Sequence, residues 1–263
     1  MEIELIEKII IKGKICVKTG LRIGGPESGL KIGGIDNPVV TDPEGKPYIP
    51  GSSLKGKLRS LIEKKEKVSI ENGFHQCKTD KDYKNCAICK IWGVLASDNI
   101  KNLQTLTRLI VRDSYLIKES ITEEMRKNLE LEWTEVKMET AIDRVSGKAF
   151  GLRTFNRIPA GAMFDMELIY NVYDEKDKEI LIKLFESMEL LEHDYLGGMG
   201  SRGYGKIKFD DIKIFCNKKE NYEKGNLNEK PIYEAKLTEE ELKNDVSLVA
   251  KIVKEFDNIK QNL

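Results

Sequence analysis

The sequence predicts an α+β fold built on a ferredoxin-like core that carries insertions. Runs rich in β-branched residues alternate with helical runs in the order strand, helix, strand, a long hairpin, then strand, helix, strand. Residues 68–100 show no sustained hydrophobic period, which is typical of an insertion. We therefore expect one domain over residues 1–263, with insertions at about 68–100 and 133–164 and a C-terminal helix over 237–262.

The first half of the chain combines a strand, glycine-rich segments and a helix. Residues 9–18 alternate partly and are rich in isoleucine, which indicates a strand. A glycine-rich stretch then runs to Gly34, and Pro43 with Gly45 favours a turn. The helix is expected to begin at residues 51–53, with a serine as its N-cap. Its buried stripe follows helical spacing, at Leu54, Leu58, Leu61 and Ile62.

The second half of the chain alternates again between strands and helices. We expect strands over 106–117, 162–172 and 206–215, a hairpin over 133–164, and an amphipathic helix over 180–191. Segment 217–236 is polar and is expected to be a linker or loop. Thr238, with Glu241 three residues later, forms a capping-box pattern that predicts a helix reaching about Ile259.

The composition excludes several classes of protein. The 263 residues hold 44 Lys+Arg against 44 Asp+Glu, and 40% are hydrophobic. That apolar fraction excludes wholesale disorder, and the zero net charge argues against a histone-like or tail-type nucleic-acid binder. No apolar run reaches the roughly 18–20 residues that span a bilayer, and the first residues do not resemble a signal peptide, so no membrane is expected. Five cysteines, an odd number, indicate thiols or metal ligands in a reducing cytoplasm.

Four soft or borderline donors gather on one short stretch, namely His75, Cys77, Cys86 and Cys89. Tetrahedral zinc takes such a Cys₃His set, and the C-x-x-C pair is the usual chelating turn. The alternative is three reduced cysteines and a surface histidine that are close by chance. Because the chain has only two histidines, we favour zinc. The site would be structural, since protein donors fill all four positions and leave none for a substrate water.

The start of the helix at residue 51 is a candidate anion site. Free N–H groups at a helix start bind anions, and Ser52 and Ser53 add hydroxyl donors. Lys55 and Arg59 lie one turn apart, on a face distinct from the leucine stripe. Gly56 costs about 1 kcal/mol relative to alanine inside a helix, so it indicates close approach of another backbone or a ligand. An ordinary capped helix with a solvated basic face is the alternative.

Residues 197–205 form a second glycine-rich segment. Gly197, Gly198 and Gly200 would expose consecutive N–H groups to a phosphate, with Arg202 as the counter-charge. The spacing differs from a Walker or dinucleotide fingerprint, and the segment leads into a strand instead of a helix. Its weight as evidence comes from its combination with the serine-lysine helix.

The expected hairpin tip is basic and aromatic. Residues 144–160 contain no acid, and their basic and aromatic members are Arg144, Lys148, Phe150, Arg153, Phe155 and Arg157. Such a tip suits phosphate neutralisation with base stacking or wedging in single-stranded nucleic acid. Alternatively, the aromatic residues join the core. The net charge of zero is thus an average over the chain, in which basic residues are concentrated in segments such as 144–160 and acids lie elsewhere.

The remaining titratable residues are expected to have structural roles. Asp36, in a flexible glycine-containing loop, is by itself more typical of a turn former than of a catalyst. Asp113 and Glu139 are expected to be ion-pair partners, and His193, just past a helix end, a capping or packing residue. No Ser-His-Asp order indicates acyl transfer.

Four segments together match a known family in order. They are Thr19-Gly20-Leu21-Arg22-Ile23-Gly24-Gly25, Gly34-Ile35-Asp36-Asn37-Pro38-Val39, Tyr48-Ile49-Pro50-Gly51-Ser52-Ser53-Leu54-Lys55-Gly56 and Gly197-Gly198-Met199-Gly200-Ser201-Arg202-Gly203-Tyr204-Gly205. Through them the chain resembles the RAMP-superfamily backbone subunit of type III-A CRISPR effector complexes, the Csm group. The similarity runs from the first strand to about residue 215.

This resemblance implies a modified, RRM-like form of the ferredoxin-like core, with a lid insertion that bears the zinc site and a long thumb hairpin. Several copies would stack along one CRISPR RNA beside other Csm subunits, and each thumb would interrupt the duplex between guide and target RNA. The residues expected to bind RNA are Arg22, Ser52, Ser53, Lys55, Arg59, Arg144, Lys148, Arg153, Gly197, Gly198, Gly200 and Arg202.

The resemblance also implies an endoribonuclease in which Asp36 is catalytic and a divalent metal, Mg²⁺ or Mn²⁺, is required. The 2′-hydroxyl of the target would attack the adjacent phosphate, leaving a 2′,3′-cyclic phosphate and a 5′-hydroxyl. Relatives often have histidine where this chain has Arg22. An arginine side chain grips phosphate but cannot act as a general base, so Arg22 is assigned to guide binding. A non-catalytic guide-binding scaffold and the type III-B counterpart are the alternatives.

Overall fold

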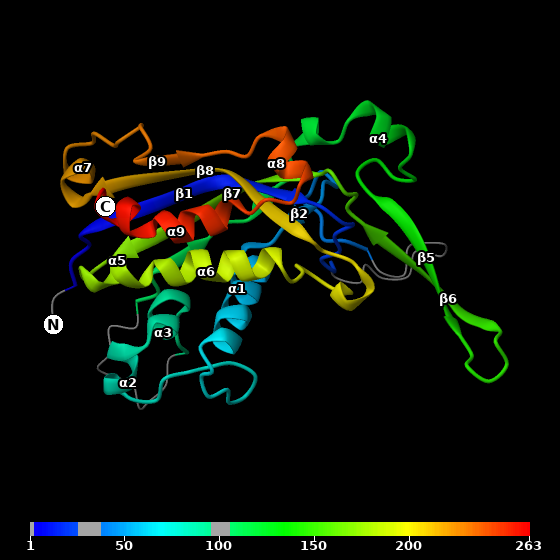
Figure 1. Ribbon diagram of the computed structural model, residues 1–263, viewed down its shortest axis with the longest axis horizontal. Helices are drawn as coiled ribbons and strands as arrows, with labels where there is room; N and C mark the ends of the chain where they lie inside the picture. Colours follow the sequence, from blue (N-terminus) through cyan, green and yellow to red (C-terminus); the bar gives the residue numbers. More distant parts are fainter. Residues whose placement is uncertain (1–2, 26–37, 96–105) are drawn as a thin grey trace.

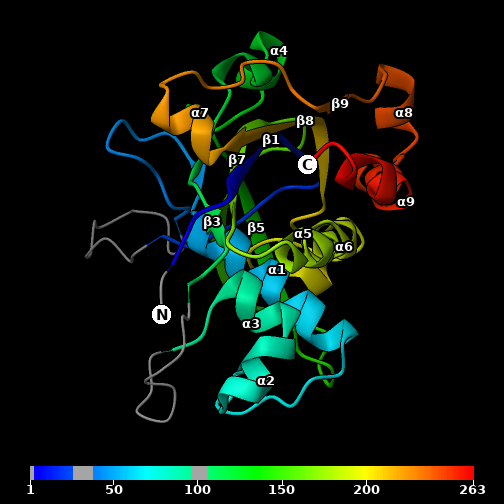
Figure 2. The same ribbon diagram turned by 90° about the vertical axis from the view of Figure 1, so that its left-hand side faces the viewer.

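The centre of the computed structural model is a five-stranded antiparallel sheet with helices packed against one face (Figures 1 and 2). The structure describes residues 3–25, 38–95 and 106–263. In the spatial order of the sheet, the strands are β3 (Leu109–Val111), β7 (Met163–Val172), β1 (Glu7–Val17), β8 (Ile207–Lys218) and β9 (Tyr233–Ala235).

Alternation along β1 explains how the sheet separates core from solvent. Ile9, Ile11 and Ile15 are buried in the main hydrophobic core. Lys12, between two of them, is exposed and stands opposite Glu167 of β7, with 3.7 Å between its Nζ and the carboxylate. One face of the sheet is therefore apolar and carries the helices, as the isoleucine pattern predicts.

Three helices cover that apolar face, namely α1 (Gly51–Lys65), α6 (Ile182–Glu192) and α9 (Leu248–Lys260). The predicted stripe of α1, formed by Leu54, Leu58, Leu61 and Ile62, is buried. The Phe185 ring of α6 lies 6.0 Å from the Phe256 ring of α9, which joins these two helices. The amphipathic patterns of the sequence thus place the helices correctly.

The chain order of these elements is that of a ferredoxin-like fold. One half runs β1, α1, β3 and the other runs β7, α6, β8, and the two halves interleave in the sheet order β3-β7-β1-β8. The predicted α+β, ferredoxin-like class is therefore confirmed.

Two further parts of the chain extend beyond the sheet. Short helices α2 (Asp80–Asn85) and α3 (Ala87–Trp92) lie beside α1 on the side away from the sheet (Figure 1). The strands β5 (Glu135–Ile142) and β6 (Ala149–Arg157) form a two-stranded hairpin that projects past the end of the sheet (Figure 1). We call the segment 75–93, which contains α2 and α3, the lid, and the hairpin of β5 and β6 the thumb. The remaining elements are β2 (Tyr48–Ile49), β4 (Ser114–Tyr115), the 3₁₀ turns Lys118–Ser120 and Gly200–Arg202, α4 (Glu123–Lys127), α5 (Lys176–Ile180), α7 (Lys219–Glu223) and α8 (Glu239–Lys243).

The start of α1 differs from the prediction. Pro50, and not a serine, is the N-cap residue, and no side chain caps the helix from that position. Instead, the N–H of Gly51 donates to the carboxylate of Asp113 over 2.7 Å. A Cβ atom on Gly51 would lie 2.3 Å from the carbonyl oxygen of Val111, so glycine allows the helix start to approach β3.

Three other expected boundaries were also wrong. The strand expected over 106–117 is divided into β3 and β4, and the segment 217–236, expected to be a linker or loop, contains α7 and β9. Thr238 and Glu241 do form a capping box, but the helix they begin is α8, which ends at Lys243. Asp245 has a positive φ of 59°, and Ser247 then caps the separate helix α9. Within the described residues, no helix has both the length and the apolar character needed to cross a membrane.

Candidate nucleic-acid interface and metal site

The two glycine-rich segments meet through their backbones. The N–H of Gly198 donates to the carbonyl of Arg22 over 2.8 Å, and the N–H of Gly205 donates to the carbonyl of Gly20 over 3.0 Å. A Cβ atom on Gly197 would lie 2.2 Å from the carbonyl oxygen of Arg22. The resulting surface, formed by residues 19–25 and 197–205, is called the glycine junction below.

The base of the thumb completes the glycine junction. Leu21 and Ile158 exchange two backbone hydrogen bonds of 2.9 and 2.8 Å. The guanidinium of Arg22 lies 5.4 Å from the centre of the Phe155 ring, within the range of a cation–π contact. Phe155 is buried, so this aromatic residue joins the core, while Phe150 nearer the tip is 59% exposed.

A hydrogen-bond and charge network ties the thumb to the glycine junction. The hydroxyl of Tyr204 donates to Glu139 over 2.8 Å, and the guanidinium of Arg202 lies 3.2 Å from the same carboxylate. The Tyr204 hydrogen bond, with Lys137 and Arg202 beside it, lowers the pKa of Glu139. Burial and the carboxylate raise the pKa of Tyr204 to about 12. Glu139 is thus the structural ion-pair partner that the sequence predicts.

Helix α1 contacts the glycine junction through a residue to which the sequence reasoning assigned no role. The Nζ atom of Lys57 lies 3.3 Å from Asp194 and 3.7 Å from the centre of the Tyr195 ring. Gly200 packs against that ring so closely that a Cβ atom would lie 1.9 Å from it. The signal that could have identified Lys57 is its place in the serine-lysine segment, three residues after Leu54 and four before Leu61, which puts it beside the buried stripe.

The start of α1 offers fewer free donors than expected. Ser52 is exposed and Ser53 is half-buried, but the Ser53 N–H donates to the Pro50 carbonyl over 2.9 Å. Lys55 donates to the Leu109 carbonyl over 2.9 Å, and burial lowers the pKa of this lysine. A Cβ atom added to Gly56 would have no described atom within 4 Å, so the predicted approach of another backbone is wrong and this helix face is open.

The other predicted RNA-binding residues do not belong to the glycine junction, and they lie on the thumb and on α1. Arg144, Lys148 and Arg153 are exposed on the thumb, and Arg153 stands opposite Glu139 in the hairpin ladder. Arg59 donates to Glu63 on the same helix and to the carbonyls of His75 and Gly93 at the lid. Asp36 lies outside the described residues.

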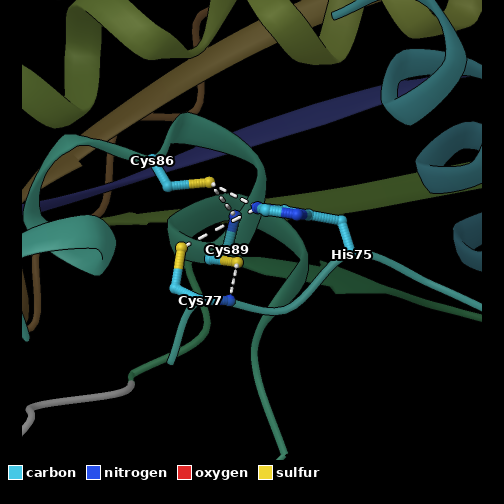
Figure 3. Close-up of side chains that lie close together, drawn as sticks. All are labelled: His75, Cys77, Cys86 and Cys89. Carbon is cyan, nitrogen blue, oxygen red and sulfur yellow. Dashed lines mark hydrogen bonds between the residues drawn. The ribbon is translucent and has the colours of Figure 1, made fainter. Parts of the chain in front are cut away.

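The four predicted metal ligands form a single cluster in the lid. One ligand atom from each of His75, Cys77, Cys86 and Cys89 lies within 4.8 Å of the others (Figure 3). The His75 Nε2 atom is 3.8 Å from the Cys77 sulfur and 3.4 Å from the Cys86 sulfur. Around tetrahedral zinc, with Zn–S about 2.3 Å and Zn–N about 2.0 Å, such donor atoms lie roughly 3.5–3.8 Å apart. The cluster can therefore bind a metal ion such as zinc.

The surroundings of the cluster suit that role. The Nδ1 atom of His75 lies 2.9 Å from the Ser69 carbonyl, which leaves Nε2 directed at the sulfurs. A hydrogen bond from Cys89 lowers the pKa of Cys86 to about 5, whereas burial raises that of Cys77 to about 11. The cysteines of the cluster are not in disulfides, so their sulfurs are available to bind a metal ion, and Cys86 is the one whose surroundings favour the thiolate.

Together the fold and the site define a class of protein, a ferredoxin-like domain with glycine-rich loops, a basic thumb and a lid whose four donor side chains can bind a metal ion. The chain belongs to the RAMP superfamily, whose family model matches residues 14–208. It is 48% identical over 230 residues to the CRISPR system Cms endoribonuclease Csm3 of Methanocaldococcus jannaschii, covering 85% of this chain and 86% of that protein.

Solved structures of relatives have the same fold. Csm3 from the crystal structure of a Csm3–Csm4 subcomplex of the type III-A interference complex is 35% identical, with a TM-score of 0.59 and 97% of both chains covered. The Methanopyrus kandleri Csm3 crystal structure is 21% identical, with a TM-score of 0.66 and 99% of both chains covered, and supports the fold alone.

Proposed function

We propose that this chain is a repeated backbone subunit of a type III-A CRISPR ribonucleoprotein, in which it binds CRISPR RNA and cleaves target RNA paired with that guide. The observation that carries the proposal is the glycine junction, where Arg22, the loop 197–205 and the thumb base form one surface. Family membership and the endoribonuclease name of the 48% identical relative support it.

The guide is held by backbone and basic groups in this proposal. The N–H groups of Gly198 and Gly205 are taken by the carbonyls of Arg22 and Gly20, so the N–H that the sequence predicts Gly198 to offer to a phosphate is not available. The guanidiniums of Arg22 and Arg202 and the close approach that the glycines allow at this surface would instead suit a phosphate chain. The RNA-binding surface continues along α1, where it includes Ser52, Ser53 and Lys55. Arg144, Lys148 and Arg153 of the thumb contact the paired target, and further copies of the chain and other Csm subunits continue the filament in the cytoplasm.

Cleavage is assigned to Asp36, as the family resemblance implies. The target 2′-hydroxyl loses its proton and attacks the adjacent phosphorus, the bond to the 5′-oxygen breaks, and that oxygen takes up a proton. The products are a 2′,3′-cyclic phosphate and a 5′-hydroxyl. The thumb would favour in-line geometry by distorting the duplex, and Asp36 would accept the proton or position a divalent ion such as Mg²⁺ or Mn²⁺, which would neutralise phosphate charge.

The test compares complexes assembled with the unaltered chain and with Asp36→Ala. The variant complex should bind labelled target RNA with unchanged affinity but cut it at least a hundredfold more slowly. Asp165→Ala, at an exposed position of β7, is the matched control and should cut normally. Normal cutting by the Asp36 variant would support the non-catalytic scaffold instead.

The lid cluster is proposed to hold structural zinc. All four ligand positions are supplied by the protein. Helix α3 packs into the main core through Ile88, Ile91 and Trp92, but the rest of the lid has only a small hydrophobic cluster formed by Cys77, Tyr83 and Cys89, so a metal ion would order that part. Metal analysis should find about one zinc per chain. Cys86→Ser should lose it, whereas Cys216→Ser, which alters a buried cysteine outside the cluster, should retain it.

A further inference from the structure

Arg59 of α1 joins the two ends of the segment that carries the metal ligands. Its guanidinium donates through NH2 to the carbonyl of His75 and through NH1 to the carbonyl of Gly93, the latter over 3.1 Å. Cys77, Cys86 and Cys89 all lie between these two residues in the sequence. The Arg59 side chain thus holds the two ends of the segment 75–93 next to each other on α1.

Glu63, one turn further along α1, completes the attachment. Its carboxylate accepts from the Arg59 Nε atom over 2.7 Å and from the His75 N–H over 3.1 Å. The backbone N–H and the carbonyl of His75 are therefore both held by α1. The Phe74 ring lies 5.2 Å from the guanidinium, which covers the pair on one side.

The lid needs such an attachment because it has little core of its own. Its two helices have six residues each, a length that is not stable in isolation. A metal ion that binds a loosely held segment must also order it, whereas a preorganised segment binds the same ion more tightly. Fixing His75 and Gly93 to α1 reduces the number of arrangements in which the four donors are apart.

We propose that Arg59 and Glu63 are positioning residues for the metal site of the lid, and that Arg59 serves this role in place of gripping RNA. The inference rests on the proposed zinc site. Arg59 is 17% exposed and Glu63 is 4% exposed, so their charges are compensated within the protein. A phosphate could recruit the guanidinium only by breaking its bonds to the two ends of the metal-binding segment.

The test measures zinc affinity by competition with a chromophoric chelator, using the full-length chain. The double variant Arg59→Met with Glu63→Met removes both side-chain attachments without leaving a buried charge unpaired. It should bind zinc 10–100-fold more weakly, the range that loss of supporting hydrogen bonds to metal ligands typically causes. Lys64→Met, an exposed change on the same helix, is the matched control and should leave the affinity unchanged.

Additional measurements separate positioning from general destabilisation. Cobalt bound to the double variant should show a weakened or shifted visible absorption, because His75 is no longer held, and Arg59→Lys should restore the affinity only partly. At saturating zinc, the double variant should bind single-stranded RNA as the unaltered chain does. Affinity within twofold of the unaltered chain, or loss of RNA binding at saturating zinc, would overturn the proposal. If the unaltered chain itself binds no zinc, the proposed zinc site fails instead.

Discussion

The N–H of Gly198 donates to the carbonyl oxygen of Arg22 across 2.8 Å, which joins two glycine-rich segments that lie far apart in the sequence. The neighbouring Gly197 has a φ of +76° and no room for a side chain beside that carbonyl. The glycines are therefore required by a contact between two parts of the backbone, and the surface they leave exposed is the one proposed to follow the guide.

Gly197→Ala should destabilise the protein strongly. The added Cβ atom would lie 2.2 Å from the Arg22 carbonyl oxygen and would also carry the strain of a left-handed backbone. The expected loss in the free energy of unfolding is about 2–5 kcal/mol, measured by urea denaturation. Gly203→Ala has a similar φ of +84° but no described atom within 4 Å, so it should lose only about 1–2 kcal/mol. Equal losses in the two variants would mean that backbone strain alone, and not the contact with Arg22, requires Gly197.

The metal cluster could be predicted from the sequence because its parts are local. His75, Cys77, Cys86 and Cys89 lie on one short stretch, and a C-x-x-C turn brings two sulfurs together in almost any fold. The glycine segments could be recognised as candidate site segments for a related reason, since their composition is unusual by itself. The contact between them depends on the sheet order, which no local pattern states.

The start of α1 shows why other parts could not be predicted. A serine N-cap is the best local choice, but the Gly51 N–H is satisfied by Asp113, which is 62 positions away. Tertiary contacts of this kind override local preference whenever the distant acceptor is better placed. The close backbone neighbour expected at Gly56 is absent for a different reason, because a glycine within a helix is equally compatible with a close neighbour and with open space, and the other predicted neighbour, a ligand, stays a prediction.

A buried ion pair between α6 and β8 leads to a second prediction. The Nζ atom of Lys208 lies 3.0 Å from the carboxylate of Glu192, and both side chains are 2% exposed or less. Lys208→Met should lower the free energy of unfolding by about 3–5 kcal/mol, because Glu192 would keep a buried, unpaired charge. Adding Glu192→Gln should recover most of the loss, since glutamine can still accept the Phe209 N–H. Urea unfolding of both single variants and the double variant gives the coupling, and additive losses would contradict this explanation.

The basic thumb predicts a change in the salt dependence of RNA binding. Each phosphate neutralised on a single strand contributes about −0.7 to the slope of log K against log salt concentration. Arg144, Lys148 and Arg153 are exposed on the thumb, so replacing all three by alanine should make the slope shallower by about 2. Titrations at several salt concentrations measure it. The control replaces Lys218, Lys224 and Lys230, which are exposed near α7 at the opposite end of the molecule, and should leave the slope unchanged (Figure 1).

Glu139 predicts a pH dependence for the attachment of the thumb. The Tyr204 hydroxyl, together with Lys137 and Arg202, lowers the pKa of this carboxylate in the folded protein. A lowered folded pKa means that the stabilisation is fully present above the unfolded pKa of about 4.3 and is lost as the pH falls through the folded value. Glu139→Gln removes the charge but keeps an acceptor for Tyr204. The difference in unfolding free energy between the unaltered chain and the variant should therefore be about 1 kcal/mol at pH 6 and should become smaller as the pH falls below about 4.3.

The same variant should bind RNA more tightly, because Glu139 is the acid that pairs with Arg202 and stands opposite Arg153. Removing this negative charge frees Arg202 for phosphate and takes an acid away from the strand position opposite Arg153, and we expect a gain of about two- to fivefold at moderate salt. Glu132→Gln, an exposed change just before the thumb, controls for the loss of one acid elsewhere. An equal difference in the free energy of unfolding at pH 3 and pH 6 would mean that the charge of Glu139 does not stabilise the attachment of the thumb. Weaker RNA binding by the Glu139 variant would mean that this carboxylate does not compete with phosphate for Arg202.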